Sequence, residues 1–433
     1  ADRRLGDGDV SGQVDDPARR IQDRARPRLH FRGLDGQALR REQPLEHRRS
    51  GDPSARRARV LHGHAARRDA PASSLEQVCR WRRRDSPDAH RTTNDRGVQG
   101  SRIDEEGDRR LATMTSIHNS TVTFGVFMPQ GWKMELVGIP TASEKWQAAV
   151  DVAQRAERAG FDSIWVYDHF HNVPRPAHEA VFECWTTMAA ISQLTSKIRL
   201  GQMVGCNLYR PPSLLAKITS SLDVISGGRL DWGIGAGWYE NECRGYGYPF
   251  PVPKDRIAML REAVEIVISM WTESETTYEG KYYQLSRANC DPKPLQAPRP
   301  PIWIGGGGEQ LTLRVVAQYA DYSNFGGSPE EFARKREILK GHCATVGRDE
   351  STITKTWSPE ILIRSTEAEL RAGQALSIRG ESFEDWRATN LVGTPDEVES
   401  KIRDYIALGC GGFVPWCVDY PTFETLDAFG EIA

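Results

Sequence analysis

The segment SIWVYDHF, from Ser163 to Phe170, is an apolar run that ends in an Asp-His pair. It comes directly after a helical stretch closed by Ala159-Gly160. This order places two ionisable side chains at the carboxyl end of a strand, which is where a (β/α) barrel builds its active site. Asp168 and His169 are therefore the first candidates for catalytic residues.

Short apolar runs rich in β-branched residues alternate with amphipathic helical stretches from Thr121 onward, which indicates βα units around a parallel sheet. A closed barrel of the TIM (β/α)8 type requires eight strands. The sequence offers eight runs: VTFGVFM, SIWVYDH, KIRLGQMV, RLDWGIGAG, PIWIGGG, DYSNF, TWSPEILIRS and GGFVPWCV. We therefore predict an α/β fold built as a (β/α)8 barrel.

Residues that favour helix ends lie between these runs. Ser143 is suited to cap a helix that runs to Gly160. Pro211-Pro212 is suited to open the next helix, and Gly227-Gly228 to close it. Thr394-Pro395 predicts the start of the last long helix.

Two stretches exceed a minimal barrel. Residues 276–303 predict a short hairpin around Glu279-Gly280 followed by a proline-rich segment, and residues 366–390 predict an irregular insertion. Long loops in barrels often cover the mouth of the active site. We expect residues 247–255 and 366–390 to select the substrate.

The charge of the chain divides it into two parts at Met114. Residues 1–113 hold 26 Arg, no Lys and 19 acidic residues, which gives 26 − 19 = +7. Residues 114–433 hold 31 basic and 40 acidic residues, which gives 31 − 40 = −9. A disordered basic arm for nucleic acid or membrane is one interpretation of the first part. We favour the other, a non-native upstream extension before a start at Met114, with the barrel domain in residues 114–433.

The remaining composition is typical of a cytoplasmic protein that binds neither nucleic acid nor membrane. The eight cysteines are scattered without CxxC spacing, which predicts reduced thiols rather than a disulfide framework. No stretch approaches the roughly 20 apolar residues that a membrane helix needs.

Two glycine-rich segments follow predicted strands. Gly305 to Gly308 lie between a strand and a helical stretch, where free backbone N–H groups and the helix dipole favour an anion such as phosphate. The segment GIGAGWYENE, from Gly233 to Glu242, also allows close approach of a flat or phosphorylated ligand, although Asn241 and Glu242 could equally form a solvated helix start.

His169 and His171 form an HxH pattern, which ligates metal in some barrels. The later predicted strand ends offer no further histidine. The sequence therefore predicts no metal site. A structural role for His169 alone is the other interpretation. Trp165, Trp303 and Trp416 lie inside strand runs, and we expect them to pack in the barrel.

Together these segments resemble the luciferase-like monooxygenase superfamily, and specifically its actinobacterial branch that depends on the deazaflavin coenzyme F420. The resemblance covers about residues 122–429 and rests on the order of several motifs. These are DSIWVYDHF, LGQMVGCNLYRPPSLLAK, SGGRLDWGIGAGWYENE, RIAMLREAVEIVISMW, YEGKYYQL and PIWIGGGGEQLTLRVVAQYADYSNF.

The resemblance implies a deazaflavin ring in the carboxyl-end mouth of the barrel. Asp168 and His169 would lie against the ring, and His169 would move a proton or stabilise charge during hydride transfer. A non-proline cis peptide is expected at Met203-Val204. The other implied cofactor contacts are Cys206, Ala236, Gly237, Asn241, and, in the phosphate-binding turn, Gly307, Gly308, Gln310 and Leu311.

One departure from the family pattern bears on the substrate. Trp238 stands where the sugar-phosphate dehydrogenases of this superfamily carry an acid-base glutamate, and their phosphate-binding lysine has no counterpart in SNFGGSPEE. Glucose 6-phosphate is therefore not the expected substrate.

The resemblance favours an oxidoreductase that moves hydride between coenzyme F420 and a small organic molecule. A monooxygenase that uses reduced FMN and dioxygen is the first alternative, because the choice of cofactor decides the reaction class. A non-catalytic cofactor-binding protein is the second. A homodimer is implied by the resemblance alone.

Overall fold

The computed structural model describes residues 122–174 and 176–433. The predicted N-terminal extension, residues 1–113, lies outside the described residues. The seven cysteines of the described part are free, as predicted. Within the same part, no helix is both long and apolar enough to cross a membrane.

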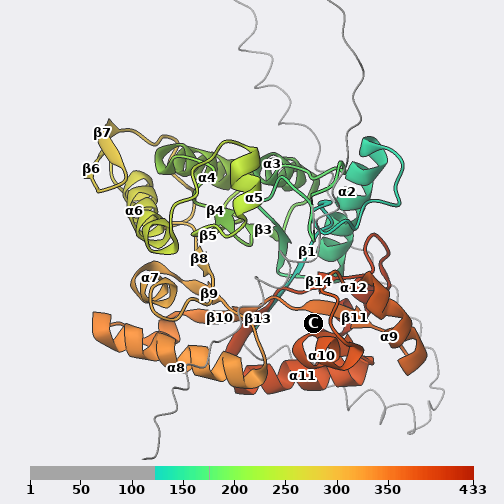
Figure 1. Cartoon of the computed structure of the whole chain (residues 1–433). Helices are drawn as coiled ribbons and strands as arrows, with labels where there is room; N and C mark the ends of the chain where they lie inside the picture. Colours follow the sequence, from blue (N-terminus) through green and yellow to red (C-terminus); the bar gives the residue numbers. More distant parts are fainter. Residues whose placement is uncertain (1–121, 175) are drawn as a thin grey trace, which may run out of the picture. The chain divides into compact units, whose positions relative to one another are not determined.

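Eight parallel strands in the described part form a closed barrel, which confirms the predicted fold (Figure 1). The ring closes because Leu200 pairs with Leu230 and Thr123 pairs with Gly412. In ring order the strands are β1 (Thr123–Phe127), β2 (Ser163–Val166), β3 (Arg199–Gln202), β5 (Leu230–Gly235), β8 (Ile302–Gly305), β9 (Tyr322–Asn324), β10 (Thr354–Trp357) and β13 (Cys410–Phe413).

Helices surround the barrel, and several of them begin and end where the sequence predicted (Figure 1). Pro212 is the first residue of its helix, and Gly160 and Gly227 end theirs in the left-handed conformation. The first of these helices is capped by Thr141 and not by Ser143, because Thr141 forms a reciprocal capping box with Glu144. The long helices are α2 (Ala142–Ala159), α3 (Cys184–Leu194), α4 (Pro212–Ser226), α6 (Pro253–Thr272), α7 (Thr312–Tyr319), α8 (Pro329–Val346), α11 (Pro395–Ala407) and α12 (Glu424–Ile432).

Two predicted runs are divided in the structure, and a third is followed by a further short strand. KIRLGQMV ends with β3, and β4 (Gly205–Cys206) follows. TWSPEILIRS gives β10 and then β11 (Glu360–Ile363), and GGFVPWCV gives β13 and then β14 (Trp416–Cys417). The strand β12 (Leu391–Gly393), which the sequence analysis missed, joins β11 and β14 in a small second sheet. One proline stands directly before β11 and another directly before β14. Because proline has no backbone N–H to donate, it interrupts the ladder of hydrogen bonds at both points.

The two insertions differ from each other. The predicted hairpin is confirmed as β6 (Thr276–Glu279) and β7 (Gln284–Ala288), which pair antiparallel. Residues 366–390 are not irregular, because they form α9 (Glu367–Gly373), a short 3-10 turn (Gln374–Leu376) and α10 (Phe383–Thr389). Thr366 and Ser382 cap these helices, and the buried Leu370 and Trp386 hold them to the small sheet. The short helix α5 (Glu240–Gly245) precedes α6.

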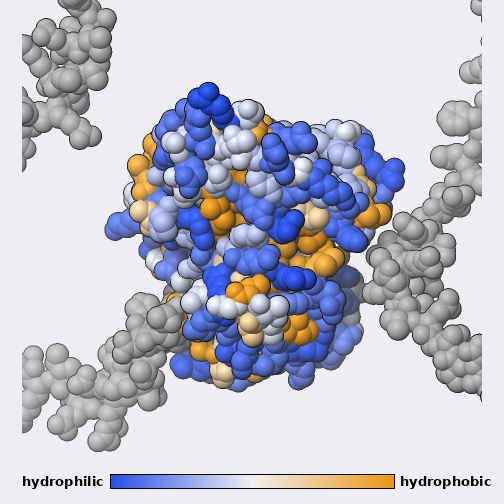
Figure 2. All heavy atoms as spheres, turned by 90° about the vertical axis from the view of Figure 1, so that its left-hand side faces the viewer, coloured by the Kyte–Doolittle hydropathy of each residue, from blue (hydrophilic) through white to orange (hydrophobic). Residues whose placement is uncertain are grey.

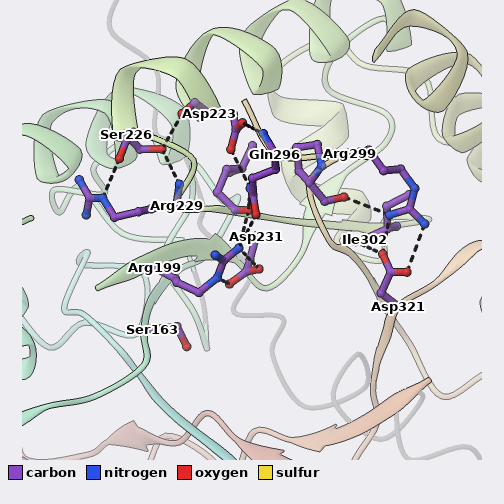
Figure 3. Close-up of polar contacts among 12 residues, drawn as sticks. Ser163, Arg199, Asp223, Ser226, Arg229, Asp231, Gln296, Arg299, Ile302 and Asp321 are labelled. Atoms are coloured by element: carbon purple, nitrogen blue, oxygen red, sulfur yellow. Dashed lines mark hydrogen bonds and ion pairs between the residues drawn. The ribbon is translucent and has the colours of Figure 1, made fainter. Parts of the chain in front are cut away.

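The amino end of the barrel is filled by packed and ion-paired side chains. Arg199 at the start of β3 makes two hydrogen bonds, of 2.8 and 2.9 Å, to the carboxylate of Asp231 at the start of β5 (Figure 3). Gln296 bonds Arg199 from the other side, at 3.1 Å. Trp165 and Trp303 pack edge to face inside the barrel, as predicted. The cavity described below lies at the opposite, carboxyl end.

The outer surface viewed from the side of α6 and α7 is mostly hydrophilic, with smaller apolar areas between polar side chains (Figure 2). This distribution is ordinary for a folded domain.

We predict that Asp231→Asn lowers the free energy of unfolding by about 2 kcal/mol, because Arg199 loses its charged partner inside the structure. Urea denaturation would measure the loss. Asp404→Asn, an exposed change on α11, is the matched control and is expected to have little effect. Equal stabilities of the two variants would contradict the prediction.

Candidate active site

A cavity of about 380 Å³ lies at the carboxyl ends of β2, β5 and β8. Of the predicted site residues, seven line it: Asp168, His169, Met203, Val204, Cys206, Ala236 and Gly237. Five do not: Asn241, Gly307, Gly308, Gln310 and Leu311. Aromatic rings make up much of the remaining wall, from Trp132, Tyr167, Tyr209, Trp238 and Tyr239. The structure thus brings the Asp-His pair and the loop after β3 together around one space.

Two contacts hold the imidazole of His169 in place, one at a ring nitrogen and one on a face of the ring. Its Nδ1 lies 2.8 Å from Oε2 of the fully buried Glu242, and its imidazole stacks on the indole of Trp132 with centroids 4.3 Å apart. A carboxylate at Nδ1 keeps the proton on that nitrogen. Nε2 is therefore the nitrogen that remains for a ligand in the cavity.

Glu242 is a residue of the site that the sequence analysis did not single out. It was considered as part of a solvated helix start, yet it is fully buried. Besides His169, its carboxylate accepts hydrogen bonds from Tyr209 Oη and from the backbone N–H groups of Phe170 and His171. Burial alone would raise the pKa of Glu242, but the hydrogen bonds from His169, Tyr209 and the backbone outweigh it and lower this pKa.

The sequence carried little signal for this role. The helix α5 has only six residues, so no periodicity separates the buried Glu242 from the exposed Glu240 two positions earlier.

Asp168 lines the cavity but is occupied by other groups. Its two oxygens accept hydrogen bonds from Arg210, at 2.7 and 3.1 Å, and Oδ2 also accepts from the backbone N–H of Cys206 at 2.9 Å. Burial raises the pKa of Asp168, and the Arg210 guanidinium opposes that rise. Asp168 therefore fixes the loop after β3 against β2.

The peptide bond between Met203 and Val204 is cis, as expected. Val204 then packs against the ends of two neighbouring strands. A Cβ on Gly305 would lie 2.8 Å from Val204 Cγ1, so only glycine leaves room for this loop. The wall of the cavity on this side is consequently made of close-packed backbone.

The glycine turn after β8 has the features of an anion site. Within the described residues, the backbone N–H groups of Gly307 and Gly308 make no hydrogen bond. Lys335 of α8 lies close by, since a Cβ on Gly307 would be 3.1 Å from its Nζ. Gly306 and Thr312 reach the cavity wall from the same turn. The SNFGGSPEE segment itself contains no cation. Lys335 follows it in the sequence, however, and places an ammonium group near the glycine turn.

Arg256, in the first turn of α6, is a second cation at the cavity and was not predicted. Its guanidinium stacks on Phe250 at 4.0 Å and donates to Pro251 O, while its buried Nε has no partner among the described residues. Of the two segments expected to select the substrate, residues 247–255 contribute Pro253 to the wall. Residues 366–390 contribute none, so that expectation is wrong for them.

The sequence of this chain is similar to those of known proteins. Residues 122–385 match the profile of a family described as luciferase-like monooxygenase. A protein of Mycobacterium tuberculosis is 31% identical over 184 residues, which cover 39% of this chain and 64% of that relative. The coenzyme F420-dependent glucose-6-phosphate dehydrogenase of Amycolatopsis mediterranei is 33% identical, over 42% of this chain and 54% of the relative. The chain thus spans between half and two thirds of these relatives.

Solved structures show the same fold. A coenzyme F420-dependent secondary alcohol dehydrogenase superposes with a TM-score of 0.62 at 20% identity, covering 72% of this chain and 98% of that one. A monooxygenase from Streptomyces bottropensis superposes with a TM-score of 0.60 at 21% identity, covering 71% and 98%.

We predict that Glu242→Ala destabilises the protein by at least about 3 kcal/mol at pH 7, because four buried donors lose their acceptor. Glu240→Ala, two residues away and exposed, is the matched control. Because folding lowers the pKa of Glu242 below 4.5, its contribution is present above pH 4.5 and is lost as the pH falls through the folded-state pKa. Urea denaturation at pH 7 and below pH 4 would measure both effects, and equal stability of the two variants at pH 7 would refute the assignment.

Proposed function

Because the chain belongs to the luciferase-like monooxygenase family, we propose that it is an oxidoreductase that moves a hydride between coenzyme F420 and a small organic substrate. The observation that carries the proposal is the setting of His169, with Nδ1 fixed by Glu242 and Nε2 left for a ligand in an aromatic cavity. Five relatives that match the chain are named as coenzyme F420-dependent glucose-6-phosphate dehydrogenases, which favours the deazaflavin.

The residues of the cavity fit a flat cofactor with an anionic tail. Met203, Val204 and the glycines of β5 and β8 give a wall on which a ring can lie, and Gly307 and Gly308 in the adjoining turn offer free N–H groups. Arg256 adds a guanidinium with an unpartnered nitrogen. A bound deazaflavin supplies a carbon that accepts or gives a hydride.

His169 performs the proton transfer that accompanies the hydride. When an alcohol is oxidised, Nε2 takes the hydroxyl proton, and in the reverse direction it returns that proton to the carbonyl oxygen. Glu242 keeps the tautomer fixed and stabilises the positive ring that forms. Trp132 on the ring face and the aromatic wall exclude water, which strengthens these interactions.

A monooxygenase that uses reduced FMN is the second candidate, because a Streptomyces monooxygenase shares the fold. Titration of the purified protein with coenzyme F420 and with FMN discriminates the two. Tight FMN binding without affinity for the deazaflavin would overturn the first proposal. The expected homodimer and the cytoplasmic location stay predictions. The prediction that glucose 6-phosphate is not the substrate, which rests on Trp238, also stays a prediction.

We predict that His169→Gln abolishes turnover with candidate alcohols and carbonyls while coenzyme affinity changes by less than about tenfold, because Gln keeps a polar group but cannot carry the proton. Reoxidation of the reduced coenzyme, followed by absorbance in a stopped-flow instrument, is the measurement. A wild type that binds the coenzyme but turns over no acceptor would favour the non-catalytic carrier instead.

We predict that Arg256→Met weakens binding of the phosphate-bearing coenzyme by at least about tenfold and leaves the truncated, phosphate-free deazaflavin unchanged. Arg261→Met, on the exposed side of the same helix, is the matched control. Fluorescence titration with both forms gives the two affinities. If both forms lost affinity equally, the prediction would be wrong, and the role of Arg256 would be to support the loop at Phe250 and Pro251.

A further inference from the structure

Trp238 follows β5 at the rim of the cavity, and it is the most exposed aromatic residue of the wall. It lines the cavity, and 62% of its surface is exposed. The other tryptophan of the wall, Trp132, is buried. A single exposed indole on an outer surface is ordinary, but this one borders the cavity that also holds His169. Its apolar ring is therefore open to a ligand.

The turn that carries Trp238 is held in place on both sides. Gly237 before it has a φ of 82°, and a Cβ there would lie 2.8 Å from Cys206 Sγ, so a larger residue would be strained. Tyr239 after it stacks on the indole, with centroids 5.0 Å apart and ring planes at 17°. The Tyr239 hydroxyl donates to Asn172 O at 3.4 Å. The exposed ring is thus presented by a supported segment.

Trp238 is a direct neighbour of His169. The indole and imidazole centroids are 5.7 Å apart, and the ring planes meet at 71°, which is an edge-to-face contact. On its own face the imidazole stacks on Trp132. A ligand that approaches His169 from the cavity therefore meets an imidazole bordered by two indoles.

The charged groups of the wall are already occupied. Besides His169, the described residues that line the cavity include two side chains with a full charge, Asp168 and Arg256. Asp168 is paired with Arg210 at 2.7 Å. Under the proposed function, Arg256 contacts the phosphate-bearing part of the coenzyme. A charged ligand group at Trp238 would lose its hydration without gaining an ionic partner, which is costly. The part of a ligand that lies on Trp238 is consequently uncharged.

We propose that the exposed indole of Trp238 binds a flat, uncharged ring of the substrate, and that Trp238 is a specificity-determining residue of the cavity. The inference rests on the proposed function, in which this cavity holds the substrate against His169. A flat ring gains apolar burial and also a stacked or edge-to-face contact with the indole, whereas a puckered aliphatic ring of similar size gains only the burial. The substrate class is an aromatic alcohol or carbonyl compound, with its ring on Trp238 and its oxygen toward His169.

Benzamide and cyclohexanecarboxamide are the probes, because both are uncharged amides and only benzamide has a flat ring. Isothermal titration calorimetry is run on the full chain, with and without coenzyme F420. We expect the wild type to bind benzamide roughly three- to tenfold more tightly than cyclohexanecarboxamide, because stacking adds to burial. Trp238→Leu removes this preference and Trp238→Phe keeps it. Trp146→Leu, a tryptophan change on α2 outside the cavity wall, leaves it unchanged.

Benzoate tests the expected absence of charge. In the coenzyme-loaded protein we expect benzoate to bind more weakly than benzamide, because no cation of the described wall remains for its carboxylate. Tighter binding of benzoate would contradict the assignment of an uncharged substrate.

Equal affinity of the wild type for the two amides would overturn the inference, as would a preference that survives Trp238→Leu. A preference that disappears when the coenzyme binds would mean that the coenzyme covers Trp238, and this result would overturn it too. Because Trp238 is exposed, we expect its variants to fold. Failure of the proposed function would be seen separately, as absence of coenzyme binding to a protein that still prefers benzamide through Trp238.

Discussion

One buried carboxylate, that of Glu242, holds the active end of this barrel together. It joins the end of β2 to the loop after β4, because it accepts from the backbone of Phe170 and His171, from His169 and from Tyr209. A fully buried charge is tolerated only when its hydrogen bonds are satisfied. The same bonds that stabilise Glu242 therefore orient His169, and the stability of the loops cannot be separated from the chemistry of the site.

Asp168 and His169 are adjacent in the chain, yet their surroundings give them different roles. The carboxylate of Asp168 is neutralised by Arg210 and tied to the backbone of Cys206. Of its two oxygens, Oδ2 accepts two hydrogen bonds and Oδ1 accepts one. The imidazole of His169 has one nitrogen bound and one available, which is the arrangement that proton transfer requires. A pair that looks symmetric in the sequence thus divides into a residue that ties the loop to the barrel and, under the proposed function, a proton carrier.

The sequence predicted what depends on local pattern. Alternating apolar runs gave the eight barrel strands, and glycine and proline gave most helix ends, because both signals act over a few residues. The split of TWSPEILIRS into β10 and β11 was missed, although Pro359 lies between the two strands and interrupts the ladder. Glu242 and Arg256 were missed for a different reason. Their roles arise from burial and from partners far away in the chain, and neither is visible in a short segment.

The cations near the glycine turn give the site a direction. Arg256 and Lys335 lie on the side of β5 and β8, together with that turn. In the ring, β1 and β5 are separated by β2 and β3, and His169 follows β2. An anion held on the β5 side would therefore approach His169 from one side and leave the β1 side of the cavity, at Trp132, for a second molecule. That arrangement suits a reaction between two bound molecules, because the reacting atoms of both can meet near one imidazole.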